Sequence, residues 1–129
     1  MGDSRPPETA PVNLVNSYAR RRGDAVEVVL ADPAPPLSAG RAVMVLRRGG
    51  AEGQRVRSPA TLVDDARGRR LVASFPADAL DDGQWRVVVR VAGQRVLPGV
   101  RLLVQGRRPT VLLWGDRPTR PQVAVQGPG

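Results

Sequence analysis

Apolar side chains recur at every second position through most of this chain, and that period limits what it can fold into. In the stretch DAVEVVLAD, Val26, Val28 and Leu30 share one face of an extended chain, while Glu27 points the other way. The stretch RRLVASFPA repeats the pattern. A period of two belongs to a β-strand with one buried face, whereas an amphipathic helix needs a period near 3.6. We therefore predict an all-β fold.

Clusters of turn-forming residues, such as DPAPPLSAG and DDARGRR, separate these runs. Their short spacing is typical of a β-sandwich or barrel. The best helical candidate is PADALDDG, residues 76–83, which is long enough for one turn. The predicted strands are 12–20, 24–31, 41–48, 54–63, 70–75, 84–92 and 94–104, with PTVLLWG, residues 109–115, as a candidate eighth.

The distribution of proline and charge predicts one folded unit between two tails. Residues 1–11 hold three prolines and almost no apolar side chains, and residues 115–129 are rich in proline and glycine. Segments of this composition bury too little apolar surface to fold. We expect a flexible tail at 1–11, a single β-sandwich domain at 12–114 and a Pro/Gly-rich tail at 115–129.

The stretch LDDGQWRVVVRV raises the question of whether its tryptophan is a core residue or a surface platform. Trp85 and the alternate valines fall on one face of the expected strand, so we predict that the ring lies in the core. The AG pair that follows forms a tight hairpin turn. Arg86, Arg90 and Arg95 are expected on the opposite face of that hairpin.

The chain has a formal net charge of +8, and all 20 of its basic residues are arginines. Arginine binds phosphate and carboxylate groups bidentately, so this charge favours an anionic partner. The competing interpretation is codon usage in a GC-rich genome, which enriches arginine without a functional demand. Arg20, Arg21 and Arg22 form a candidate anion-binding patch, for which the alternative is a solvated turn.

The inventory of side chains excludes most catalytic and metal-binding chemistry. The chain has no histidine and no cysteine, which removes the commonest general bases and metal ligands. It contains neither a P-loop nor a Gly-x-Gly-x-x-Gly motif. The acidic pairs at 64–65 and 81–82 are interpreted as turn residues, with a weak calcium site as the alternative. We expect no enzyme activity, no metal site and no cofactor.

Membrane and secretory segments are not expected either. No stretch of the sequence approaches the length and hydrophobicity of a membrane span, and its start lacks the apolar region of a secretory signal. The expected location is therefore the cytoplasm.

The run of Leu80, two acidic residues, Gly83, Gln84 and Trp85 resembles the corner before a late strand of immunoglobulin-like and fibronectin-III-like sandwiches. In that corner a tyrosine hydroxyl bonds back to the backbone. Because Trp85 stands in its place, the hydrogen bond must come from the indole N–H or be missing. The resemblance implies an immunoglobulin-like antiparallel β-sandwich of about seven to eight strands.

The span from residue 23 to residue 104 is also similar to β-sandwich accessory domains of actinobacteria. Such domains lie beside glycosyltransferases and teichoic-acid-type polymerases as non-catalytic appendages. The resemblance implies a fold and an association with enzymes of this kind, but it implies no activity for the domain itself. The matching residues are Gly23, Asp24, Val26, Val28, Arg47 to Gly50, Leu80, Gly83, Trp85, Val87, Val89, Arg90, Val91 and Gly93.

We therefore expect a non-catalytic interaction or accessory module whose partner is another protein, and the resemblance implies a cell-envelope glycopolymer transferase. The alternative is an electrostatic binder of polyanions, either nucleic acid or a phosphate polymer. Two tryptophans, one tyrosine and one phenylalanine offer little base stacking, so such binding would be blind to sequence. Trp114 marks an apolar strand that a partner could cover. The candidate partner-binding residues are Arg20, Arg21, Arg22, Arg86, Arg90, Arg95 and Trp114.

Overall fold

Ten strands and one short 3-10 turn make up the part of the chain that the computed structural model describes, which is residues 8–35, 37, 41–49, 53–66, 68–105 and 108–114. The all-β prediction is confirmed. The elements are β1 (Glu8–Thr9), β2 (Asn13–Arg22), β3 (Ala25–Ala31), β4 (Ala42–Arg48), β5 (Gln54–Asp65), β6 (Gly68–Pro76), η1 (Ala77–Ala79), β7 (Gly83–Val91), β8 (Gln94–Leu97), β9 (Val100–Gln105) and β10 (Arg108–Trp114).

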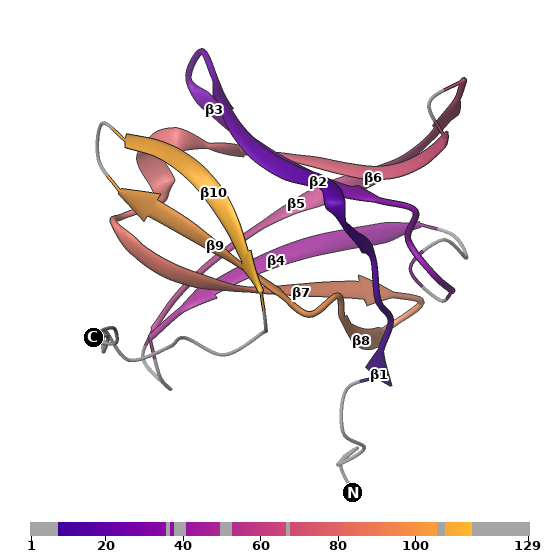
Figure 1. Ribbon diagram of the computed structural model, residues 1–129. Helices are drawn as coiled ribbons and strands as arrows, with labels where there is room; N and C mark the ends of the chain where they lie inside the picture. Colours follow the sequence, from indigo (N-terminus) through magenta and orange to yellow (C-terminus); the bar gives the residue numbers. More distant parts are fainter. Residues whose placement is uncertain are drawn as a thin grey trace, which may run out of the picture.

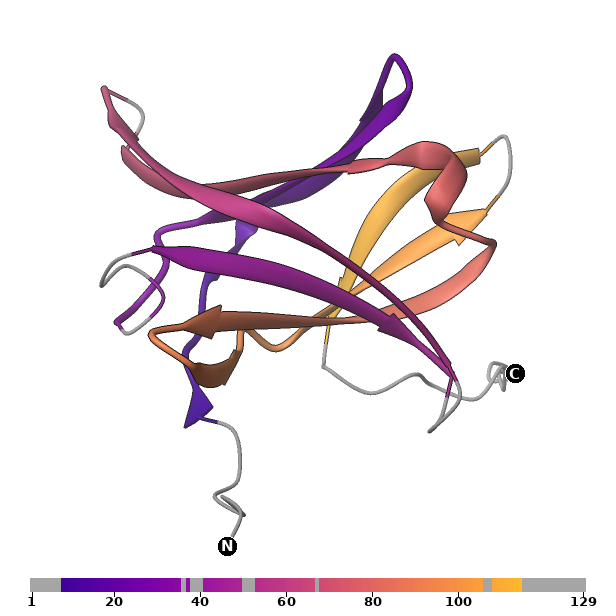
Figure 2. The ribbon, with the colours of Figure 1, turned by 180° about the vertical axis from the view of Figure 1, so that it is seen from behind.

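All ten strands belong to one sheet that curls until its ends nearly meet. The strand order is β1-β8-β7-β4-β5-β6-β3-β2, while β9 pairs with the first half of β7 and β10 pairs with β9. β10 returns to lie against β2, and Figures 1 and 2 show this nearly barrel-shaped arrangement from opposite sides. Every pair is antiparallel except β1 with β8, which is parallel.

This arrangement differs from the expected sandwich of seven to eight strands in its strand count and in how its layers are joined. The layers are joined differently because β5, which is twelve residues long, pairs with two neighbouring strands. Its first half pairs with β4 from Gln54 to Ala60, and its second half pairs with β6 from Ala60 to Asp65. One long, bent strand therefore connects what would otherwise be two separate sheets.

Two further differences raise the strand count. The expected strand at 94–104 is split into β8 and β9, because Pro98 has no N–H to donate and Gly99 adopts a positive φ of 81°. At the start of the chain, Glu8 and Thr9 pair with Val96 and Leu97 of β8. Ala10 follows with only 1% of its surface exposed, so the folded unit begins earlier than residue 12. Within 76–83, the expected helical turn is η1.

The core fills the inside of the curled sheet, and it consists of the alternate side chains that the sequence pattern selects. Trp85, Phe75 and Leu30 are among its largest fully buried members. Val26, Val28 and Leu71 join them in the same cluster. The prediction that Trp85 is a core residue is therefore confirmed, since its side chain is 0% exposed.

The corner before β7 is closed by a hydrogen bond from the indole N–H of the tryptophan. The indole Nε1 of Trp85 donates to the carbonyl oxygen of Asp81 at 2.9 Å. Arg48 covers the ring from outside, with its guanidinium carbon 5.6 Å from the ring centroid. The Nη1 of Arg48 also donates to the carbonyl oxygen of Asp82 at 3.1 Å. The corner is thereby fixed to the end of β4.

The described part of the chain contains no helix long and apolar enough to cross a membrane. The stretches 1–7 and 115–129, where we expect tails, lie outside the described residues.

Candidate functional site

Six arginines gather on the outer side of β4, β5, β7 and β8, and we call this surface the arginine face. It is outer because the alternate residues of β4, such as Met44 and Leu46, are fully buried in the core. Across the strands, Arg47 of β4 lies opposite Arg55 of β5 and Arg86 of β7. The six members are Arg47, Arg55, Arg57, Arg86, Arg90 and Arg95.

Valines occupy the middle of the arginine face. Val45 lies opposite Arg57 on one side and Val88 on the other, and Val43 lies opposite Arg90. A hollow of about 460 Å³ sits over the two β4 valines and is walled by Arg55, Arg57 and Arg90. The face is therefore a shallow groove along β4 with an apolar floor and basic walls.

The apolar floor is held in a cluster of its own. Val45, Val88 and Leu97 are 7%, 4% and 9% exposed although they lie on the outer side of the sheet, and Val43 packs against them. Arginine stems are long enough to lie over such side chains while the charged ends stay in water. The guanidinium groups of the arginine face therefore lie above a packed layer of apolar side chains.

The charges on this face repel one another. The pKa of Arg47 is lowered, first by burial of its guanidinium and then by the positive charges of its arginine neighbours. Those neighbours are Arg55, Arg86, Arg95 and Arg90. Like charges directly opposite each other on neighbouring strands destabilise a sheet. An anion bound among them would relieve that repulsion.

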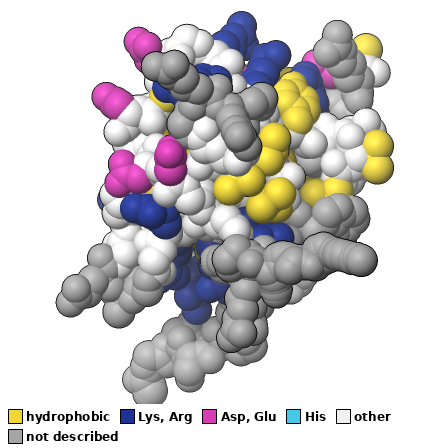
Figure 3. Space-filling view, turned by 60° about the vertical axis from the view of Figure 1, so that its left-hand side comes forward, with side chains coloured by type: hydrophobic (Ala, Val, Ile, Leu, Met, Phe, Trp, Pro, Cys, Tyr) yellow, Lys and Arg dark blue, Asp and Glu magenta, His cyan; other side chains and the backbone are white. Residues whose placement is uncertain are grey.

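The arginine face is strongly basic in the part that the structure describes. No described strand residue that points outward from β4, β5, β7 or β8 beside these arginines is acidic. Elsewhere on the molecule, Arg20, Arg22, Arg48, Arg69 and Arg70 form ion pairs with carboxylates. In Figure 3 acidic side chains gather toward the upper left, and a separate group of arginines lies at the lower centre.

The structure brings together one of the two arginine groups that the sequence singles out. Arg90 and Arg95 are direct cross-strand partners, and Arg86 shares their face four residues away. Sequence reasoning missed Arg47, Arg55 and Arg57. The alternation in RVRSPA does place two of these on one face of a strand, but only the pairing of β5 with β4 brings them beside β7.

The second group, at the end of β2, does not form a single patch. Arg20 donates to Glu27 at 2.7 Å and Arg22 lies 3.8 Å from the same carboxylate. This hydrogen bond, followed by the charge of Glu27, raises the pKa of Arg20. Arg21 points to the other side of β2, opposite the buried Val26. Strand alternation therefore prevents the three guanidinium groups from fanning toward one anion.

Trp114 ends β10, where its backbone pairs with Val100. Its side chain lies outside the described residues, so the expectation that it forms a partner surface stays a prediction. Elsewhere on β10, Leu112 packs against the core and Val111 is 37% exposed.

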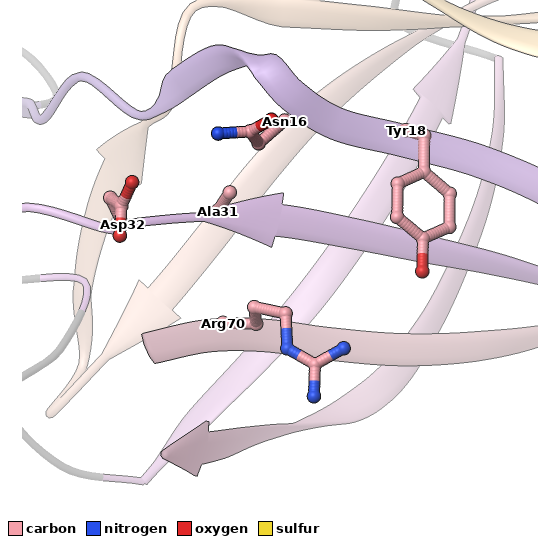
Figure 4. A pocket seen from close by; sticks show the side chains of 5 residues that line it. All are labelled: Asn16, Tyr18, Ala31, Asp32 and Arg70. Atoms are coloured by element: carbon pink, nitrogen blue, oxygen red, sulfur yellow. The ribbon is translucent and has the colours of Figure 1, made fainter. Parts of the chain in front are cut away.

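A second hollow, of about 310 Å³, lies where β2 separates from β3, and Figure 4 shows its lining. The pairing shifts register between Asn13 and Tyr18. Asp32 in this lining accepts a hydrogen bond from Asn13 at 3.0 Å, and Arg70 pairs with Asp65 at 2.6 Å. Because this hollow combines an acidic and a basic side chain, it selects a ligand by charge less strongly than the arginine face does.

Metal coordination has no visible site in the described residues, where no three histidine, cysteine, aspartate or glutamate side chains come together. Comparisons of the chain with family models, with curated proteins and with solved structures find no match. The arginine face is therefore the feature of this chain from which a function can be inferred.

Proposed function

We propose that this chain is a non-catalytic, immunoglobulin-like interaction module that binds an anionic partner on the arginine face. The observation that carries the proposal is the gathering of six outward arginines from four adjacent strands. Electrostatic complementarity of this kind speeds association and selects partners by charge.

The strand order supports an immunoglobulin-like relationship. β2, β3, β6 and β5 follow the order of strands A, B, E and D in an immunoglobulin domain, and β4, β7 and β9 follow the order of C, F and G. The corner bond from Trp85 to Asp81 supports it as well. In this interpretation the arginine face is the outer surface of the sheet that contains C and F.

The chemistry of the face supports binding rather than catalysis. A guanidinium group is a donor with no acceptor, and it stays protonated in proteins. Such a group holds phosphate or carboxylate in a bidentate pair but does not accept a proton as a general base. The described part of the face supplies no carboxylate to do so in its place.

The test compares two variants that each lose three positive charges. One carries Arg86→Gln, Arg90→Gln and Arg95→Gln, and the other carries the three substitutions to glutamine at 20–22. Both are applied to a heparin column and eluted with a salt gradient, because contacts between arginine and polyanions weaken steeply with salt. We expect the first variant to elute at clearly lower salt than the second. Equal elution would mean that net charge alone determines retention, and the proposal would fail.

A second candidate, docking of a protein through an apolar surface, is favoured by the region around β2 and β10. Val15 is 90% exposed and Val111 is 37% exposed, and Figure 3 shows hydrophobic side chains gathered on one flank of the molecule. A cell-envelope glycopolymer transferase would be a partner of this kind. Binding of such a candidate partner should survive 1 M salt and should weaken with Val15→Ser, whereas binding on the arginine face should not survive that salt.

A further inference from the structure

The arginine face carries its charge in rows that repeat along the strands. Read across β5, β4, β7 and β8, the rows are Arg55–Arg47–Arg86, then Arg57–Val45–Val88, then Pro59–Val43–Arg90–Arg95. The first row is basic throughout, the middle row has an apolar centre, and the third row is basic on the β7 side. Along the groove over β4, the basic row at Arg47 is followed by the valine floor of Val45 and Val43, and Arg90 and Arg95 flank the far end of this floor on the β7 side.

The spacing of these rows has the period of an extended chain. Successive rows are two residues apart on each strand, which is about 6.6 Å. An extended peptide that lies along the groove points alternate side chains at the same face with the same spacing. Such a peptide needs no distortion to place one side chain over each row.

We propose that the anionic partner is an extended acidic segment of a protein with the pattern acidic–x–apolar–x–acidic, bound along the groove over β4. This inference rests on the proposed function and specifies its partner. The first acidic side chain pairs with Arg47 and its row neighbours, and the second pairs with Arg90 and Arg95. The apolar side chain between them enters the hollow over Val43 and Val45.

The valine floor favours a peptide over a phosphate polymer. A strongly hydrated phosphate chain has no apolar group to bury in the hollow of about 460 Å³ over Val43 and Val45, whereas an apolar side chain is removed from water there. An apolar anchor in a pocket surrounded by charged and polar contacts is the usual anatomy of a binding hot spot. Single-stranded nucleic acid would gain little, because the described part of the face has no aromatic side chain on which bases could stack.

The test uses the whole protein and three labelled nine-residue peptides of equal charge. The first is Gly-Ser-Asp-Thr-Leu-Thr-Asp-Ser-Gly, the second replaces its leucine with serine, and the third moves the leucine to the end so that the aspartates lose their central anchor. We expect the serine peptide to bind about tenfold more weakly than the first. We expect the rearranged peptide to lose a similar factor, since its leucine no longer reaches the floor.

A matched protein variant separates the floor from the charge. Val43→Thr keeps the shape and the β-branch but makes the floor polar, and circular dichroism verifies that the variant is folded. It should weaken the leucine peptide by about fourfold and leave the serine peptide unchanged. Long-chain polyphosphate is titrated in parallel as the competing ligand.

The outcomes distinguish the two proposals. Equal binding of all three peptides, or tighter binding of polyphosphate with no effect of Val43→Thr, would overturn the peptide pattern and leave the anion-binding function standing. Failure of every anionic probe, together with equal heparin elution of the two triple variants, would overturn the proposed function itself.

Discussion

The indole nitrogen of Trp85 lies 2.9 Å from the carbonyl oxygen of Asp81, four residues earlier in the chain. This bond ties the start of β7 to the corner that precedes it, while the ring itself is completely buried. A tryptophan thus performs two tasks that a corner tyrosine would perform, namely filling the core and satisfying a backbone acceptor. The two tasks can be separated by mutation.

Trp85→Phe should destabilise the fold by about 1–3 kcal/mol, because the carbonyl of Asp81 loses its partner while most of the ring volume remains. Trp85→Ala should cost about 3–5 kcal/mol, since it adds a large cavity. Urea unfolding followed by far-ultraviolet circular dichroism measures both. A fully stable Trp85→Ala variant would contradict the burial of this ring.

Arg48→Met should destabilise the corner by about 1 kcal/mol. Methionine keeps much of the stem but loses the contact with the Trp85 ring and the bond to the carbonyl of Asp82. Arg69→Met is the matched control, because Arg69 makes an exposed ion pair at the β5–β6 turn and exposed pairs contribute little. Equal unfolding midpoints for the two variants would show that Arg48 does not secure the corner.

The alternation of apolar residues was sufficient to predict which side chains enter the core. Val26, Val28 and Leu30 are buried as their spacing requires, and so is Trp85. A period of two reports the face of a strand directly, because successive side chains point to opposite sides. The same signal put Arg86 and Arg90 on the outside.

Strand neighbours could not be predicted in the same way. A period of two states which face a residue occupies but not which strand lies beside it. Arg55 and Arg57 join Arg86 only because β4 lies between β5 and β7, a pairing that connects residues far apart in the chain. The complete arginine face was therefore invisible to local pattern reasoning, although half of its members were identified.

The dual pairing of β5 was equally hidden. The sequence from Gln54 to Asp65 reads as one strand, and it is one strand. That its two halves serve different neighbours depends on the twist and bend of the sheet, which follow from packing of the whole core. The expected two-layer sandwich and the observed, nearly closed sheet therefore differ because of β5.

Ala92→Asn should stabilise the protein by about 0.5–1 kcal/mol. Ala92 and Gly93 form the β7–β8 turn with φ values of 53° and 79°, and a turn with two positive φ values favours asparagine followed by glycine. Gly93→Ala should have the opposite effect on the urea midpoint, although nothing within 4 Å would contact the new methyl group. A lower urea midpoint for Ala92→Asn would show that backbone strain at residue 92 does not limit the stability of the protein.

Arg47→Gln should raise the free energy of unfolding by about 0.5 kcal/mol at low salt, because it removes repulsion from four neighbouring arginines. The gain should disappear in 1 M salt, where the screening length falls to about 3 Å. The same substitution should weaken binding of the acidic peptide. A gain in stability that persists at high salt would indicate that the substitution removes the cost of burying the Arg47 guanidinium, and not the repulsion from neighbouring arginines.

Binding of the acidic peptide and stability of the fold should both be constant between about pH 6 and pH 8.5. The chain has no histidine and no cysteine whose side chain would titrate there. The lowered pKa of Arg47 means that the unfolded chain holds this proton more tightly than the folded one. Stability therefore rises with pH, but only as the pH approaches deprotonation of guanidinium, far above this window.

Fluorescence anisotropy of the labelled peptide between pH 6 and pH 8.5 measures the binding. A marked fall in affinity within this range would require a titrating group that the arginine face does not contain, and would contradict the assignment of the site.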